Sequence, residues 1–168
     1  TVNIEVFRPY VNFLEIDGGV YPCHWCHGTF ARAMELYRMT TNEDTSFEEL
    51  LVGRAGIEGA LSLVIAALER GGMKDAFTNV TAWALGDIET FIQLMNNGLE
   101  RYFPEIDPDD IVPEIPEEDL DMSYPDTVQH DMLKKVDMIG FYKALTRAGI
   151  PPETIENMTL RGTLAFLE

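Results

Sequence analysis

The sequence contains few basic residues. Its 168 residues include 12 lysines and arginines against 29 aspartates and glutamates, which gives a net charge of −17 at pH 7. Proteins that bind DNA or RNA obtain much of their affinity from lysine and arginine side chains that displace counterions from phosphates. A strongly negative field repels phosphate backbones instead. We therefore expect no nucleic-acid partner.

Long apolar runs and cysteines are also scarce. The longest apolar run, residues 61–68, is interrupted by Ser62 and is far shorter than the roughly 20 residues that span a membrane. No basic and apolar leader opens the chain, so we expect a cytoplasmic protein without a membrane span. Two cysteines do not make a disulfide framework, and a chain of this length can bury a core without one.

The acidic residues are concentrated in one segment. Residues 105–126 contain ten acids and no base, whereas residues 127–168 contain five of each. Five of the nine prolines lie between positions 104 and 125. Proline interrupts helices and like charges repel, so this stretch is expected to be extended. The sequence thus predicts a domain over 1–104, an acidic Pro-rich linker over 105–126 and a small helical unit over 127–168.

The N-terminal residues have the composition of strands. Residues 10–16 and 20–25 are rich in β-branched and aromatic side chains, and they flank Asp17-Gly18. An Asp-Gly pair between two such runs is typical of a tight β-hairpin. Residues 2–7 are a candidate third strand. We expect a β-hairpin or small antiparallel sheet here.

Helical periodicity follows the strands. Apolar residues after His27 have helical spacing, namely Phe30, Ala33, Met34 and Tyr37. Ser46 and Glu49 form a capping box that predicts one helix continuing to Leu68 and ending at Gly71-Gly72. A further helix is predicted over 87–102, with a stripe of Ile88, Phe91, Ile92, Met95 and Leu99; residues 73–86 are ambiguous. The fold class is predicted as α+β, mainly α, with the hairpin packed on a three-to-four-helix layer.

The last part of the chain also reads as helical. Asp137 is a candidate N-cap of a helix through Ala148, which Gly149 would end. Pro151-Pro152 predicts the start of a short helical turn through Asn157. Thr159 is the expected cap of a last helix. These signals give the C-terminal helical unit.

One motif invites a chemical interpretation. Cys23-His24-Trp25-Cys26-His27 has the Cys-x-x-Cys-His spacing of c-type haem attachment, and it could also belong to a redox or zinc site. Zinc needs four ligands, and chelating cysteines need a turn between them rather than a strand. Haem attachment needs export to an oxidising compartment. We interpret these residues as structural and expect no cofactor, with a metal site on Cys23, Cys26 and His27 as the alternative.

Other candidate sites lack required residues. Gly53, Gly56 and Gly59 are not followed by the Gly-Lys-Ser/Thr of a phosphate-binding loop, so they indicate a close helix crossing or a kink. The aspartates at 107–110 lack the glycine and glutamate of a calcium loop. Residues 143–162 resemble a helix-turn-helix but lack its basic residues before Arg161. No catalytic set is recognisable, and we expect no enzymatic activity.

Two segments carry a family resemblance. Residues 17–23, Asp-Gly-Gly-Val-Tyr-Pro-Cys, with residues 28–34, Gly-Thr-Phe-Ala-Arg-Ala-Met, resemble the opening of tail assembly chaperones of siphophages and prophages. Residues 141–144, 148–152 and 158–161 are similar to the C-terminal helix pair of tail chaperones and their frameshift extensions. The two matches occur in the same order, on either side of the linker. The N-terminal segment is longer than this family leads us to expect, and Trp25-Cys26-His27 replaces less reactive residues.

The resemblance implies a function without catalysis. Such chaperones coat the helical tape measure protein, prevent its aggregation and recruit tail tube subunits in the host cytoplasm, and they are absent from the mature virion. The neutral C-terminal unit would present one or two of five candidate partner-binding residues, whereas most of the five are expected to pack its own core: Phe141, Tyr142, Leu145, Ile155 and Met158. Homo-oligomerisation is left open. The alternative functions are a structural tail or head-completion protein and a small metal-binding protein.

Overall fold

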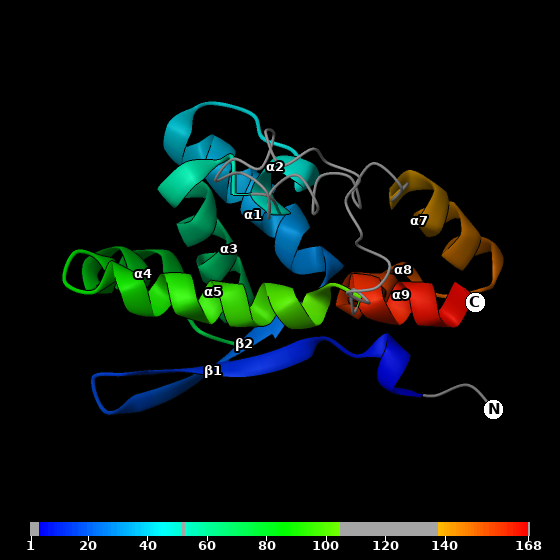
Figure 1. Cartoon of the computed structure of the whole chain (residues 1–168), viewed down its shortest axis with the longest axis horizontal. Coiled ribbons are helices and arrows are strands. Elements are labelled where there is room, and N and C mark those ends of the chain that lie inside the picture. Colours follow the sequence, from blue (N-terminus) through cyan, green and yellow to red (C-terminus); the bar gives the residue numbers. More distant parts are fainter. Residues whose placement is uncertain (1–3, 52, 105–137, 168) are drawn as a thin grey trace, which may run out of the picture.

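The computed structural model describes residues 4–51, 53–104 and 138–167 (Figure 1). In chain order these form a 3-10 helix η1 (Ile4–Phe7), strands β1 (Tyr10–Ile16) and β2 (Gly19–Trp25), and helices α1 (His27–Thr41), α2 (Phe47–Leu51), α3 (Gly56–Arg70), α4 (Ala76–Ala84), α5 (Ile88–Tyr102), α7 (Met138–Arg147), α8 (Pro152–Asn157) and α9 (Leu160–Leu167). A two-stranded antiparallel sheet packs on helices, which confirms the predicted α+β, mainly α class. The predicted linker over 105–126 and the predicted cap Asp137 lie outside the described residues.

The Asp17-Gly18 hairpin is confirmed. β1 and β2 pair antiparallel with Ile16 opposite Gly19, so the two residues between them form the whole turn. Asp17 and Gly18 have φ values of 50° and 75°, as a type I′ turn requires. The candidate strand over 2–7 is wrong where it is described, because Ile4–Phe7 is a 3-10 helix packed against α9.

The hairpin is joined to α5 through a tryptophan and an asparagine. The Trp25 indole N–H donates to Asn12 Oδ1 at 2.7 Å, and the Asn12 amide donates to the Leu94 carbonyl at 3.2 Å. The fully buried Trp25 ring also lies against Gly98, at a place where a Cβ atom would collide with the ring. The missing side chain of Gly98 therefore allows α5 to approach the sheet.

The predicted continuous helix over 46–68 is wrong. Its start is confirmed, since the Glu49 amide donates to Ser46 Oγ at 3.1 Å. However, α2 ends at Leu51 and α3 begins at Gly56. Gly53 and Gly56 have φ values of 76° and 71°, a left-handed conformation that breaks the helix and that glycine adopts without strain. α3 then runs to Arg70 and is capped by Gly71, as predicted.

α3 is the centre of the core, and it contacts α1, β2, α4 and α5. Most of its length is buried, as expected for a helix that is apolar on nearly every side. α4 shows that the ambiguous region holds a helix. α5 begins after the predicted cap Asp87, but its buried stripe is Phe91, Leu94, Gly98 and Tyr102; of the predicted stripe, only Phe91 is fully buried and Ile88 is exposed.

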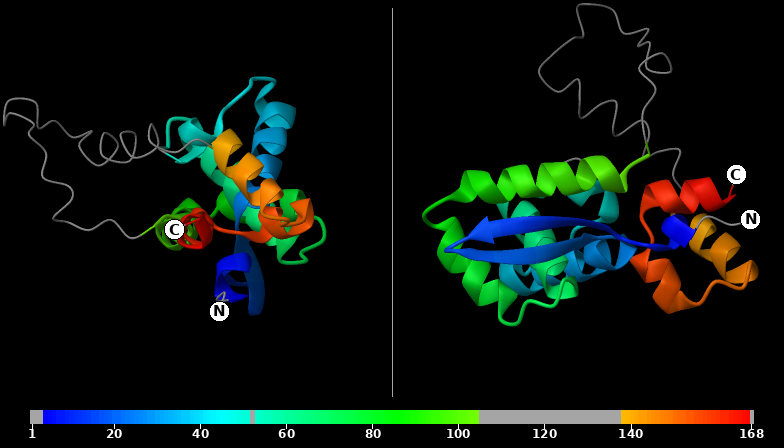
Figure 2. Two further views of the ribbon diagram at one scale, coloured as in Figure 1. Left: turned by 90° about the vertical axis from the view of Figure 1, so that its right-hand side faces the viewer. Right: turned by 90° about the horizontal axis from the view of Figure 1, so that it is seen from below.

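The C-terminal helices gather at one end of the molecule, beside η1 (Figure 2). Gly149, with φ 87°, follows α7, and α8 begins at Pro152, as predicted. Thr159 Oγ1 accepts from the Gly162 amide at 2.9 Å, which confirms the predicted cap of α9. No helix in the described ranges is both long enough and apolar enough to cross a membrane.

The close approach of Gly98 and Trp25 predicts the effect of one added methyl group. Alanine normally favours a helix by about 1 kcal/mol over glycine. Gly98→Ala should nevertheless lower the free energy of unfolding by about 1–3 kcal/mol, because the Cβ must displace a buried indole. Urea denaturation is the measurement, with a substitution at the neighbouring exposed Asn97, Asn97→Ala, as control. A Gly98→Ala protein as stable as the parent would contradict this packing.

Candidate functional site

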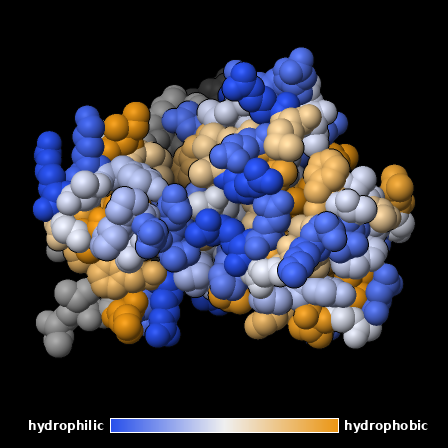
Figure 3. Space-filling view, turned by 180° about the vertical axis from the view of Figure 1, so that it is seen from behind, coloured by the Kyte–Doolittle hydropathy of each residue, from blue (hydrophilic) through white to orange (hydrophobic). Residues whose placement is uncertain are grey.

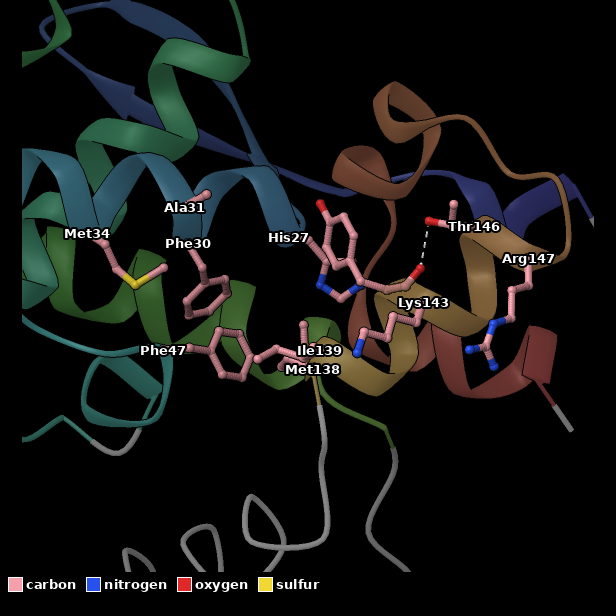
Figure 4. A pocket seen from close by; sticks show the side chains of 11 residues that line it. His27, Phe30, Ala31, Met34, Phe47, Met138, Ile139, Lys143, Thr146 and Arg147 are labelled. Atoms are coloured by element: carbon pink, nitrogen blue, oxygen red, sulfur yellow. Dashed lines mark hydrogen bonds between the residues drawn. The ribbon is translucent and has the colours of Figure 1, made fainter.

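An open groove of about 560 Å³ lies between α1, α2 and α7 (Figure 4). Among the described residues, its lining comes from His27, Phe30, Ala31 and Met34 of α1, Phe47 of α2, and Met138, Ile139, Tyr142, Lys143, Thr146 and Arg147 of α7. The lining is mostly apolar. Surface hollows of this kind are common binding sites.

α1 forms one wall through a single stripe. Its four lining residues have the spacing i, i+3, i+4 and i+7, so they share one face of the helix. The ring of Phe30 packs against Phe47 at 4.9 Å and against Tyr102 at 4.7 Å between centroids, which fixes the aromatic floor. Met34 is half-buried beside them. The sequence predicted the apolar face with Phe30 and Met34, but not that it borders a groove.

α7 forms the other wall, and its character changes along its length. Met138, Ile139 and Tyr142 are apolar or aromatic, and Ile139 is 70% exposed. Lys143 and Arg147 follow one turn apart, with Thr146 between them (Figure 4). Arg147 lies in the last turn of α7, where positive charge is favoured by the helix dipole, and Lys143 lies one turn earlier. The wall is therefore apolar at one end and basic at the other.

The buried side chain of His27 bridges α5 and α9 beneath this groove. His27 is 6% exposed, and its Nδ1 lies 2.7 Å from the Tyr102 hydroxyl while its Nε2 lies 2.8 Å from Thr163 Oγ1. A neutral imidazole has one donor and one acceptor, and both are satisfied here by hydroxyl groups. Burial lowers the pKa of His27 to about 4, and burial also raises the pKa of Tyr102 well above its usual value.

Further hydrogen bonds hold the C-terminal helices in place. The His27 amide donates to the Met158 carbonyl at 2.9 Å. Arg161 donates to the carbonyls of Phe103 and Glu100 at the end of α5, at 2.7 and 3.1 Å. Arg70 at the end of α3 donates to Asn157 Oδ1 at 2.9 Å. These contacts fix α8 and α9 in place. Because α7 packs on both of them, α7 lies opposite α1 across the groove.

The five candidate partner-binding residues occupy different environments. Leu145, Ile155 and Met158 are buried together in a small second core, so their side chains hold α7 and α8 together. Phe141 packs partly against the main core. Tyr142, which is 37% exposed, is the only one of the five that lines the groove.

The sequence did not predict most of the groove. It did not single out Phe47, Met138, Ile139, Lys143, Thr146 or Arg147 as site residues. The available signal was the apolar pair Met138-Ile139 followed by two bases at helical spacing, Lys143 and Arg147.

The Cys-x-x-Cys-His residues are spread over the end of β2 and the start of α1. Both cysteines are free and buried, and burial raises the pKa of the Cys23 thiol to about 12. Cys26 Sγ lies 3.4 Å from Thr29 Oγ1. Both nitrogens of His27 are already hydrogen-bonded. In the part of the chain that the structure describes, no group of three or more His, Cys, Asp or Glu residues is placed to hold a metal ion.

Comparison of the chain with known protein families, with curated proteins and with solved structures found no match. A functional assignment must therefore come from the residues and the groove described above.

The buried histidine predicts a loss of stability in mild acid. Its folded pKa is lowered to about 4 from an ordinary 6.5, so its contribution is complete above pH 6.5 and is lost as the pH falls toward 4. Between pH 7.5 and 5 the parent protein should lose about 2 kcal/mol more unfolding free energy than His27→Gln. Urea denaturation at both pH values measures this difference.

Nuclear magnetic resonance titration of the native protein checks the same point without a variant. The His27 ring signals should change only slightly between pH 7 and 5, because most of the imidazole stays neutral with a pKa of about 4. A titration midpoint near 6.5 would contradict the buried, neutral histidine.

The burial of the two thiols predicts low reactivity. Both side chains are shielded from a reagent in solution, since Cys23 and Cys26 are 0% exposed. Burial also disfavours the thiolate of Cys23, which is the reactive form. The native protein should react at least about tenfold more slowly with Ellman's reagent than the same protein in urea. Rapid modification of Cys23 or Cys26 in the native state would show that the end of β2 opens.

Proposed function

We propose that this chain is a non-catalytic tail assembly chaperone of a long-tailed bacteriophage, which binds the tape measure protein and recruits tail tube subunits. The observation that supports it best is the groove between α1 and α7, which is apolar and held open by the contacts of His27 and Arg161. The identity of the proposed partners rests on the resemblance to that family of residues 17–23, 28–34, 141–144, 148–152 and 158–161. The site of action is the host cytoplasm, and the mature virion would lack the chain.

The composition of the groove suits a partner with varied sequence. Met34 and Met138 have flexible, polarisable side chains that adapt to different apolar shapes. Phe30, Phe47 and Tyr142 add rigid aromatic surface. A chaperone for a long helical protein must cover many similar apolar faces, and an apolar groove between helices is a common way to bind them.

The remaining surface is compatible with a soluble carrier. On the face opposite to that of Figure 1, hydrophilic residues separate the apolar ones over much of the view (Figure 3). The net charge of −17 opposes non-specific association of complexes. A complex with an aggregation-prone partner would retain the negative charge of this chain, which would keep the complexes apart in solution.

A charge placed in the groove should weaken partner binding without unfolding the protein. Ile139→Asp changes a side chain that is 70% exposed, so its effect on stability should be small. Met39→Asp is the matched control, because Met39 is 72% exposed on α1 and does not line the groove. In co-expression with the tape measure protein of the same genome, the parent and Met39→Asp should keep that protein soluble and co-elute with it. Ile139→Asp should weaken the association at least about tenfold.

Two results would overturn the proposal. One is a parent protein that neither solubilises nor binds the tape measure protein. The other is detection of the chain in mature virions by mass spectrometry, which would favour a structural tail or head-completion component.

A further inference from the structure

We infer that the occupant of the groove is a single amphipathic α-helix that carries two carboxylates one turn apart beside its apolar stripe. This inference rests on the proposed function for the identity of the partner, a helix of the tape measure protein. It concerns the chemistry by which the groove recognises that helix, namely the pairing of those carboxylates with Lys143 and Arg147.

The walls of the groove favour a helix over an extended strand. The groove is bordered by side chains of α1, α2 and α7, and beyond the first turn of each helix the backbone groups are bonded within the helix. An extended segment would bring its own N–H and C=O groups into this apolar space without backbone partners. A helix satisfies those groups internally and presents only side chains. The stripes on α1 and α7 are the surfaces against which a third helix packs, at roughly 8–10 Å between axes.

The charged side chains that line the groove determine which residues the bound helix would carry beside its apolar stripe. Among the described residues that line the groove, Lys143 and Arg147 are cations and no carboxylate is present. Both side chains are exposed, and neither forms an ion pair with another described residue. They are four residues apart, so both point to the same side of α7. Two carboxylates at i and i+4 on an adjacent helix match this spacing.

These cations contrast with the rest of the chain. With 29 acids against 12 bases, most of the molecule repels an acidic partner at long range. Lys143 and Arg147 are a local attractive pair beside the apolar surface, where bound apolar groups reduce screening by water. Charge pairs in such positions govern specificity and orientation more than total affinity.

Designed peptides test this directly on the full-length purified chain. Three helical peptides share a hydrocarbon crosslink on the solvent face and one leucine-methionine stripe. They differ only in the two residues at i and i+4 beside that stripe, which are Glu/Glu, Gln/Gln or Lys/Lys. Fluorescence polarisation of labelled peptides gives the dissociation constants. The Glu/Glu peptide should bind at least about tenfold more tightly than the Lys/Lys peptide.

Charge reversal provides the matched control. The double variant Lys143→Glu/Arg147→Glu should invert the order of the Glu/Glu and Lys/Lys peptides. Arg54→Glu/Lys74→Glu changes the net charge equally at two exposed positions outside the groove and should keep the original order. Equal affinity of all three peptides for the parent protein would overturn the charge pairing. Binding of none of them, by a chain that still solubilises the tape measure protein, would overturn the helical occupant.

Two further outcomes separate this inference from the proposed function. Tight, charge-selective binding of the Glu/Glu peptide without any association with the tape measure protein would uphold the chemistry of the groove and reject the chaperone function. Replacement of the ten acids of residues 105–126 by amides tests whether this stretch of the same chain occupies the groove. Loss of ten charges also weakens the long-range repulsion of the Glu/Glu peptide, so the Gln/Gln peptide is the one that reports on occupancy. A tenfold or larger gain in Gln/Gln affinity in that variant would overturn a partner helix as the principal occupant.

Discussion

The contact of His27 with Tyr102 and Thr163 is the interaction on which the rest of the structure depends. The two hydroxyls lie 75 and 136 residues away in the chain, on α5 and α9. A buried imidazole without partners would cost about 1–3 kcal/mol, so docking of the C-terminal helices and burial of His27 require each other. Because α7 forms one wall of the groove, the groove exists only when these helices are docked. A residue from an apparent haem motif thus has a structural role.

This dependence has a functional consequence. The α1 wall belongs to the body built around α3, and the α7 wall is fixed by Leu145, Ile155 and Met158 together with Arg161. Both walls are therefore formed by contacts within the chain itself. A preformed site loses less conformational entropy on binding than one that must be assembled. In the proposed complex, apolar contact would supply affinity, while Lys143 and Arg147 would supply the preference for an acidic flank.

Local signals in the sequence predicted much of the fold. The Asp17-Gly18 turn, the Gly71 stop and the Thr159 cap depend on neighbouring residues, and the structure confirms each of them. The helix break at Gly53 and Gly56 was missed because apolar periodicity continues on both sides of it. The groove was missed for a different reason. It joins two helices about a hundred residues apart, and only tertiary hydrogen bonds such as those of His27 bring them together.

Site-specific photo-crosslinking tests the central claim, that the groove between α1 and α7 binds the tape measure protein, most directly. A benzophenone amino acid would replace Ile139 in the groove or, in a second protein, Met39 at a comparably exposed position on α1. After co-expression and irradiation, the account predicts a crosslinked band with the tape measure protein from position 139 and none, or far less, from position 39. Equal crosslinking from both positions, or crosslinking from position 39 alone, would contradict it.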